Sequence, residues 1–126
     1  MKRVITTAAA PSAIGPYSQA IEANGFVFVS GQLPLDPATG AFVDGGIAEQ
    51  AEQSIKNLLA VLKAAGCTAD DVVKTTVFMI DIGDFALVNE IYGRYFSGKC
   101  PARCAMQAGA LPKGALIEIE AIAAKP

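Results

Sequence analysis

An apolar stripe with helical spacing runs through the middle of this chain, and it restricts the possible folds more than any other feature. Apolar side chains recur every three or four residues, at Ile47, Ala51, Ile55, Leu58, Leu59, Leu62 and Ala65. Gly66 follows where a helix C-terminus favours glycine. The spacing predicts one long helix over 47–65 with a single apolar face, and that face needs an apolar surface to cover.

Segments with strand composition lie on both sides of this helix. Five of them are rich in β-branched, aromatic or alternating apolar residues and span 2–7, 26–30, 72–80, 102–108 and 115–123. A turn is predicted at Asn24-Gly25, and a second helix is predicted to begin after Asp84 and to continue through Phe96. The order is about three strands, helix, strand, helix and two strands. It predicts one α+β domain over 1–126, a sandwich of one mixed β-sheet with two helices on one face.

Alternation in the last predicted strand sorts its side chains onto two faces. Ile117, Ile119 and Ala121 point one way and are predicted to lie under the helices. Glu118 and Glu120 share the other face, where repulsion between like charges can raise the pKa of one carboxyl and suit it to act as a general base. Solvation at a sheet edge is the commoner role of a strand glutamate, and that alternative stays open.

Arg103 opens the preceding strand, which is otherwise uncharged, and shares a face with Ala105 and Gln107. A guanidinium is costly to bury unless it meets an anion, and its planar fork suits a carboxylate. A structural ion pair with Glu118 or Glu120 is the alternative. These residues predict a small pocket that pairs one cation with one carboxylate, and by themselves they identify no reaction.

Four further positions are candidates with an ordinary structural alternative. Tyr17 follows Gly15-Pro16, and its alternative role is that of an aromatic side chain packed in a turn. Ser30 precedes Gly31, so the Ser30 hydroxyl and the Gly31 backbone N–H could meet a ligand, and the alternative is a simple turn. Asn89 lies in the second predicted helix and could be a surface residue.

The composition excludes several classes of protein. The chain has no histidine, which removes Ser-His-Asp and Cys-His nucleophile systems and histidine-ligated zinc or haem. Its net charge of −2 argues against a nucleic-acid module. Hydrophobic residues make up 52% of this small domain, so we expect part of its surface to be buried in an oligomer.

Neither a membrane segment nor a disulfide framework is predicted. The longest charge-free stretch, 4–21, is broken by Pro11, Gly15 and Pro16, and the N-terminus makes a weak signal peptide. The three cysteines, Cys67, Cys100 and Cys104, offer no CxxC pair, so free thiols in a reducing cytosol are expected. Cys104 is expected to point to the face opposite its neighbour Arg103.

Seven short motifs, in order along almost the whole chain, resemble those of the reactive-intermediate deaminase (Rid, formerly YjgF) family of enamine/imine deaminases. They span residues 13–20, 29–32, 73–77, 88–89, 101–103, 111–115 and 117–121. The resemblance implies a chorismate-mutase-like fold and a homotrimer with a central barrel-like core, with active sites in clefts between subunits. It also implies hydrolysis of small 2-imino acids, tautomers of 2-aminoacrylate and 2-aminocrotonate, to 2-oxo acids and ammonia without a cofactor or metal.

The resemblance also assigns roles to particular residues. Arg103 would hold the substrate carboxylate and Glu118 would position or deprotonate the attacking water. The pocket would be lined by Tyr17, Ser30, Gly31, Asn89 and Ala105. Many relatives carry cysteine or threonine at the position of Ala105, so no thiol or hydroxyl is carried over and only a backbone contact is expected there.

Two other functions stay open on the sequence alone. One is a trimer without enzymatic activity that senses ligands or acts like a chaperone through the same cleft or its apolar surface. The other is an endoribonuclease, which the acidic balance and the missing histidine disfavour.

Overall fold

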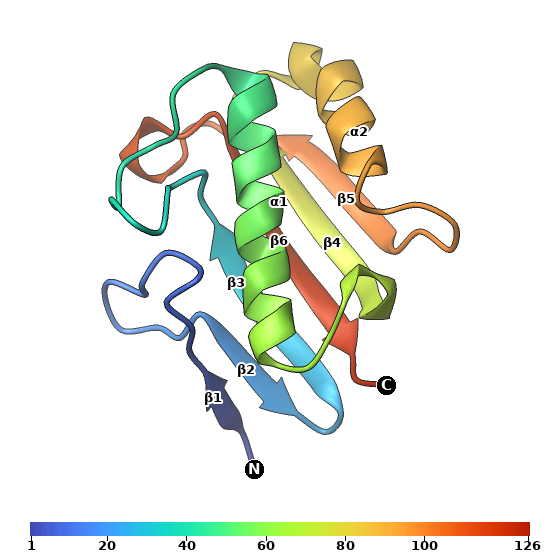
Figure 1. Cartoon of the computed structure of the whole chain (residues 1–126). Helices are drawn as coiled ribbons and strands as arrows, with labels where there is room; N and C mark the ends of the chain where they lie inside the picture. The colour runs from blue at the N-terminus through green and yellow to red at the C-terminus, as the bar shows by residue number, and fades with distance from the viewer.

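One six-stranded sheet carries both long helices on the same face (Figure 1). The computed structural model describes residues 1–126. Its strands and helices are β1 Arg3–Ile5, β2 Ala20–Ala23, β3 Phe26–Gln32, α1 Ile47–Ala64, β4 Val72–Met79, α2 Phe85–Gly93, β5 Ala102–Gln107 and β6 Ile117–Ala124. Short 3₁₀ turns span Ala69–Asp71 (η1), Ile82–Asp84 (η2) and Pro112–Gly114 (η3). The predicted α+β architecture is confirmed.

The last strand of the chain lies near the middle of the sheet. The strand order is β1-β2-β3-β6-β4-β5, so β6 pairs with both β3 and β4. All pairs are antiparallel except β4 and β5, which are parallel and joined by a crossover that contains α2. The sheet is therefore mixed, as predicted, and β5 forms one of its edges.

The hydrophobic core lies between the sheet and α1. Ile55, Leu58 and Leu62 of α1 are fully buried, as are Ile117 and Ile119 of β6. These are the side chains that the helical and strand periodicities assigned to the inner faces, so the predicted sorting of β6 is confirmed. A central strand buried on one face explains the alternation in its sequence.

Two local predictions were incomplete. The turn at Asn24-Gly25 has φ values of 52° and 80°, and it joins β3 to the four-residue β2, whose range the sequence did not indicate. The second helix begins after Asp84 as predicted but ends at Gly93, three residues before Phe96, because Arg94 and the residues after it continue as turns.

The sheet face away from the helices is apolar and open. Val4, Phe28 and Met106 lie on it with 55%, 45% and 44% of their surface exposed. Isolated exposed apolar residues are ordinary, but here they gather on one face that no element of the chain covers. No helix has the length and apolar character needed to cross a membrane.

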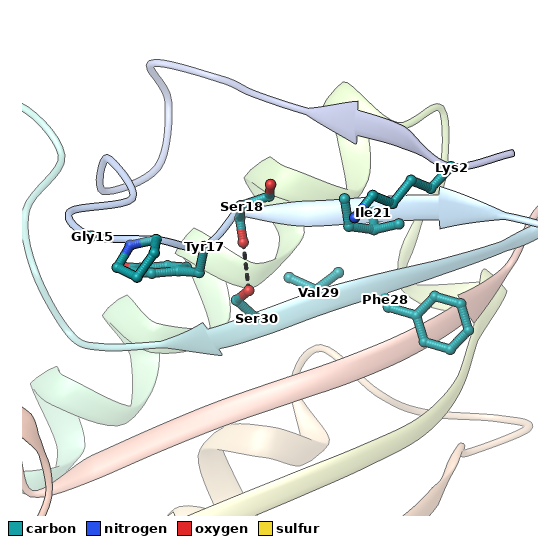
Figure 2. A pocket seen from close by; sticks show the side chains of 9 residues that line it. Lys2, Gly15, Tyr17, Ser18, Ile21, Phe28, Val29 and Ser30 are labelled. Atoms are coloured by element: carbon teal, nitrogen blue, oxygen red, sulfur yellow. Dashed lines mark hydrogen bonds between the residues drawn. The ribbon is translucent and has the colours of Figure 1, made fainter.

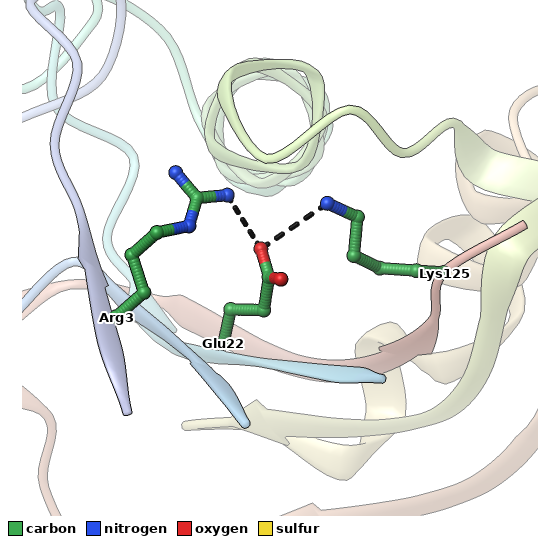
Figure 3. Close-up of polar contacts among 3 residues, drawn as sticks. All are labelled: Arg3, Glu22 and Lys125. Carbon is green, nitrogen blue, oxygen red and sulfur yellow. Dashed lines mark hydrogen bonds and ion pairs between the residues drawn. The ribbon is translucent and has the colours of Figure 1, made fainter. Parts of the chain in front are cut away.

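A three-residue ion cluster ties the first strands to the C-terminus (Figure 3). Glu22 of β2 accepts hydrogen bonds from Arg3 of β1 at 2.5 Å and from Lys125 at 3.2 Å. The Arg3 hydrogen bond, followed by that of Lys125, lowers the pKa of Glu22 below its usual value. The ionised carboxylate is therefore favoured by folding.

This lowered pKa predicts a stability difference that depends on pH. A carboxyl with a depressed folded-state pKa stabilises the protein above its unfolded pKa, about 4.3, and loses that contribution as the pH falls through the folded value. We expect Glu22→Gln to lower the melting temperature at neutral pH, and this deficit to shrink as the pH falls below about 4.3. Thermal melts across this range measure the difference.

Glu90→Gln is the matched control, because Glu90 forms an exposed 3.7 Å pair with Arg94 on α2. We expect its melting temperature to follow that of the wild type at every pH. A Glu22→Gln deficit that persists unchanged in acid would contradict the role assigned to the ionised carboxylate.

Candidate functional site

A β-bulge in β3 opens the sheet beside the two glutamates of β6. β3 has two residues, Ser30 and Gly31, where β6 has one, Glu120, and the pairing register shifts there. A bulge bends its strand and redirects side chains, which is why bulges are common next to active sites.

A cavity of about 640 Å³ lies at this bulge. The carboxylates of Glu118 and Glu120 line it together with Lys113 of η3 and Tyr17. The rest of its wall comes from uncharged side chains of two loops and the end of β3, including Pro11, Ile14, Leu33, Leu35 and Pro112. The cavity thus combines an acidic side with an apolar side.

Gly31 permits the close approach of the Glu118 side chain. A Cβ atom built on Gly31 would lie 2.8 Å from the Cδ atom of Glu118, closer than two such carbons can come. Glu118 is half-buried and has no hydrogen-bond or ion-pair partner within the chain. Burial, and secondly the charge of Glu120, raises the pKa of Glu118. The predicted repulsion between the two carboxyls is present, but desolvation is the larger cause.

The hydroxyl of Ser30 contacts the chain itself. It donates a hydrogen bond of 2.6 Å to the carbonyl of Ser18, in the segment that follows Tyr17 (Figure 2). The structure therefore engages the donor of Ser30 in holding this segment against β3. Tyr17 is 55% exposed, so its alternative interpretation as a packed turn aromatic is wrong.

Gln19 holds the same loop and was not singled out from the sequence. Its buried amide donates to the carbonyls of Thr7 and Pro11 at 3.0 and 2.8 Å, and its oxygen accepts from the Thr7 N–H at 2.7 Å. A buried amide is kept only when it is hydrogen-bonded. A glutamine in a turn-rich segment carries no sequence signal of that burial.

Arg103 lies at a different place, on edge strand β5 and beneath α2. Its Nη1 donates a 2.7 Å hydrogen bond to Oδ1 of Asn89, so Asn89 is not merely a surface residue. The guanidinium carbon lies 5.2 Å from the ring centre of Phe85 and 4.9 Å from that of Tyr92. Ala105, two residues along β5, packs against the core on the same face.

The pocket predicted to pair Arg103 with a carboxylate does not form within one chain. Arg103 pairs with Thr75 of β4, which pairs with Ala121 on the helix-covered face of β6. Glu118 pairs with Phe78 of β4. It lies three residues from Ala121, an odd number, so its side chain points to the opposite face of the sheet. The predicted pocket and the alternative ion pair with either glutamate are both wrong for a single chain, because the sheet separates the two groups. The structure instead places two separate groups of residues on the two faces of the sheet, one around Glu118 and one around Arg103.

The cysteines take no part in either group. All three are free, as expected. Cys67 is buried, and this burial raises the pKa of its thiol. Cys104 pairs with Thr76 and so points away from the side of Arg103, as predicted.

Comparison with known proteins identifies the family. Residues 7–125 match the Endoribonuclease L-PSP family. The chain is 56% identical to the 2-iminobutanoate/2-iminopropanoate deaminase of Homo sapiens over 123 residues, covering 98% of this chain and 90% of the human protein. A Rid family protein from Yersinia pestis superposes with a TM-score of 0.95 at 53% identity, covering 98% and 99% of the two chains. The structure of Escherichia coli TdcF with bound serine superposes with a TM-score of 0.94 at 41% identity, again covering 98% and 99%. The chain therefore belongs to the Endoribonuclease L-PSP family and is one of the Rid proteins, as its motifs predicted.

Proposed function

We propose that this protein is a 2-iminobutanoate/2-iminopropanoate deaminase that hydrolyses small 2-imino acids to 2-oxo acids and ammonia. Five relatives at 53–57% identity carry that name. The serine bound to TdcF is a small amino acid with the same carboxylate group. The observation that carries the proposal is the pair of half-sites, an arginine with a fixed guanidinium and a half-buried glutamate with a raised pKa.

The complete site is assembled from two protomers in this proposal. Arg103 and Glu118 lie on opposite faces of one sheet, so they can bind one small molecule together only across a subunit boundary. The open apolar sheet face supplies a surface that association would bury. A closed ring of three subunits, as the family resemblance implies, gives three equivalent sites with Arg103 from one subunit and Glu118 from the next.

The chemistry follows from these two groups. The Arg103 fork binds the substrate carboxylate and orients the C=N carbon. The Glu118 carboxylate accepts a proton from water as its oxygen bonds to that carbon, which gives a tetrahedral aminoalcohol. With the imine bound in its protonated form, the nitrogen then takes up this proton from Glu118. The C–N bond breaks as the C=O bond forms, and the hydroxyl proton passes through Glu118 to the departing ammonia, which leaves as ammonium. The water supplies the carbonyl oxygen, and Glu118 is ionised again at the end.

The remaining lining residues define the space around the reacting carbon. Tyr17 and Gly31 border Glu118, and Asn89 and Ala105 border Arg103. The apolar side of the cavity is formed by Ile14, Leu33 and Leu35, and it suits a short uncharged substrate side chain. The carboxylates of Glu118 and Glu120 disfavour an acidic substrate side chain.

Mixed oligomers test the shared site directly. Arg103→Ala and Glu118→Gln are each expected to be inactive alone. After they are mixed in equal amounts, unfolded and refolded together, about a quarter of the sites in a ring receive both intact residues. The assay generates 2-iminobutanoate with a threonine dehydratase and follows the extra rate of 2-oxobutanoate release. Recovery of about a quarter of wild-type activity is expected.

A mixture with no activity, from subunits that refold and associate normally, would overturn the shared site. Wild-type protein that gives no acceleration would overturn the deaminase function itself. In that case a ligand-sensing trimer would still bind 2-oxobutanoate in a calorimeter without shortening the life of the imine.

A substitution at Gly31 tests the approach of Glu118. In Gly31→Ala the new methyl group displaces the flexible Glu118 side chain, so we expect a nearly unchanged melting temperature and about a 10²-fold lower kcat. Gly109→Ala is the control, because a Cβ there meets open space. Equal kcat values for the two variants would contradict the assigned position of Glu118.

A further inference from the structure

Three side chains of one helix converge on the Arg103 guanidinium. Phe85, Asn89 and Tyr92 stand at positions i, i+4 and i+7 of α2 and therefore share one helix face. Asn89 accepts one hydrogen bond from Nη1, and the two rings lie 5.2 and 4.9 Å from the guanidinium carbon. Aromatic rings attract a guanidinium through its face and leave its in-plane N–H groups free to bind a carboxylate.

Tyr92 is itself held from two sides. Its hydroxyl lies 2.8 Å from Oγ1 of Thr75, on the strand that pairs with β5 and directly across from Arg103. Its ring also packs against Phe96, with 4.6 Å between the ring centres. Thr75 is fully buried and Tyr92 is 5% exposed. The hydrogen bond thus joins two buried groups, and the ring has no room to turn away from Arg103.

The exposed position of Arg103 makes such support significant. A long side chain at an open sheet edge loses rotamer freedom when it binds a ligand, which weakens binding. A guanidinium already held in one orientation avoids most of that loss. Asn89 holds one nitrogen, whereas the rings restrict the plane of the whole group.

We propose that Tyr92, anchored by Thr75, is a positioning residue that fixes the Arg103 guanidinium for the substrate carboxylate. This inference rests on the proposed role of Arg103 in the deaminase reaction. It assigns the Thr75–Tyr92 pair to substrate binding and not to the chemical step. Because the carboxylate is bound equally in the ground and transition states, the pair should affect KM more than kcat.

Three variants separate positioning from simple structural support. Tyr92→Leu removes the ring and is expected to raise KM about ten-fold, with kcat changed less than about two-fold. Tyr92→Phe and Thr75→Val each remove one side of the hydrogen bond and are expected to raise KM about three-fold. The double variant should resemble either single one, because both delete the same contact.

Tyr95→Phe is the matched control. Tyr95 lies in the turn just after α2, but its hydroxyl donates to Glu52 of α1 at 2.6 Å and does not contact Arg103. We expect a lower melting temperature and an unchanged KM. A purely structural role of Tyr92 would give its variants this same result, which would overturn the inference.

A measurement without substrate completes the test. Nitrogen NMR reports rotation of the Arg103 guanidinium, and we expect Tyr92→Leu to speed that rotation while Tyr95→Phe does not. Unchanged rotation and unchanged KM in an active enzyme would overturn the positioning role alone. An inactive wild type would instead overturn the deaminase function, and the rotation measurement would still decide whether Tyr92 orders Arg103.

Discussion

Arg103→Ala is expected to lower kcat/KM for 2-iminobutanoate by about 10²–10³-fold, chiefly through KM. Loss of one partner from a desolvated, hydrogen-bonded charge pair costs about 2–5 kcal/mol, which corresponds to this range. The fold should survive, because Arg103 is exposed on an edge strand and forms no ion pair within the chain. Steady-state kinetics with imine generated in the cuvette measure the effect.

Two further variants sharpen this prediction. Arg103→Lys keeps the charge but loses the planar fork and the stacking on two rings, so we expect it to recover only part of the loss. Arg94→Ala removes an exposed arginine at the C-terminal end of α2, the helix that carries both rings, and should behave as the wild type. Activity of Arg103→Ala within two-fold of wild type would refute the proposed carboxylate contact.

Glu118→Gln is expected to lower kcat by about 10²–10⁴-fold, with little change in KM. The amide has nearly the same shape as the carboxylate, but it cannot accept a proton from water. The half-buried side chain has no partner within the chain to lose, so the melting temperature should not fall. A variant that retains wild-type kcat would show that another group activates the water.

The raised pKa of Glu118 also predicts the pH dependence of the reaction. A general base must be ionised, so activity falls as the pH drops through its pKa, and this acid limb should lie above the usual glutamate value of 4.5. Burial is the main cause of the shift and the charge of Glu120 the second. Glu120→Gln should therefore move the acid limb of the activity profile to lower pH, but it should reverse only part of the rise in the Glu118 pKa.

The position of the acid limb is measured from kcat/KM as a function of pH, with the threonine dehydratase that generates the imine in excess at each pH. Lys113→Gln serves as the control, because Lys113 lines the same cavity whereas burial and Glu120 account for the raised pKa of Glu118, so the limb should stay in place. An acid limb that also stays in place in Glu120→Gln would mean that the titrating group is not Glu118.

The elements of the fold were largely predictable, because local periodicity specifies them. The apolar stripe from Ile47 indicated α1 to within one residue of its end, and alternation in β6 separated Ile117 and Ile119 from Glu118. The range of the short strand β2 was not indicated because four residues carry too little pattern. The second helix ended early at Gly93, a residue with low helix propensity.

The candidate residues were predictable one by one, but their contacts were not. Asn89 gave no sign in the sequence that it would bind Arg103, fourteen positions later and on another element. Gln19 and the Thr75–Tyr92 pair are buried polar groups whose partners come from distant segments. Such contacts depend on how elements pack, and residue type alone does not specify packing.

The sequence by itself determined which side chains share a face within each strand and each helix, because periods of 2 and 3.6 residues are properties of the backbone. Only the tertiary structure decided that Arg103 and Glu118 lie on opposite faces of one sheet. That relation depends on the register of β5 and β6 against β4, and hydrogen bonding between strands distant in sequence sets that register. The same register brings Thr75 opposite Arg103 and leaves Glu118 on the open face, so that one chain keeps these two groups apart.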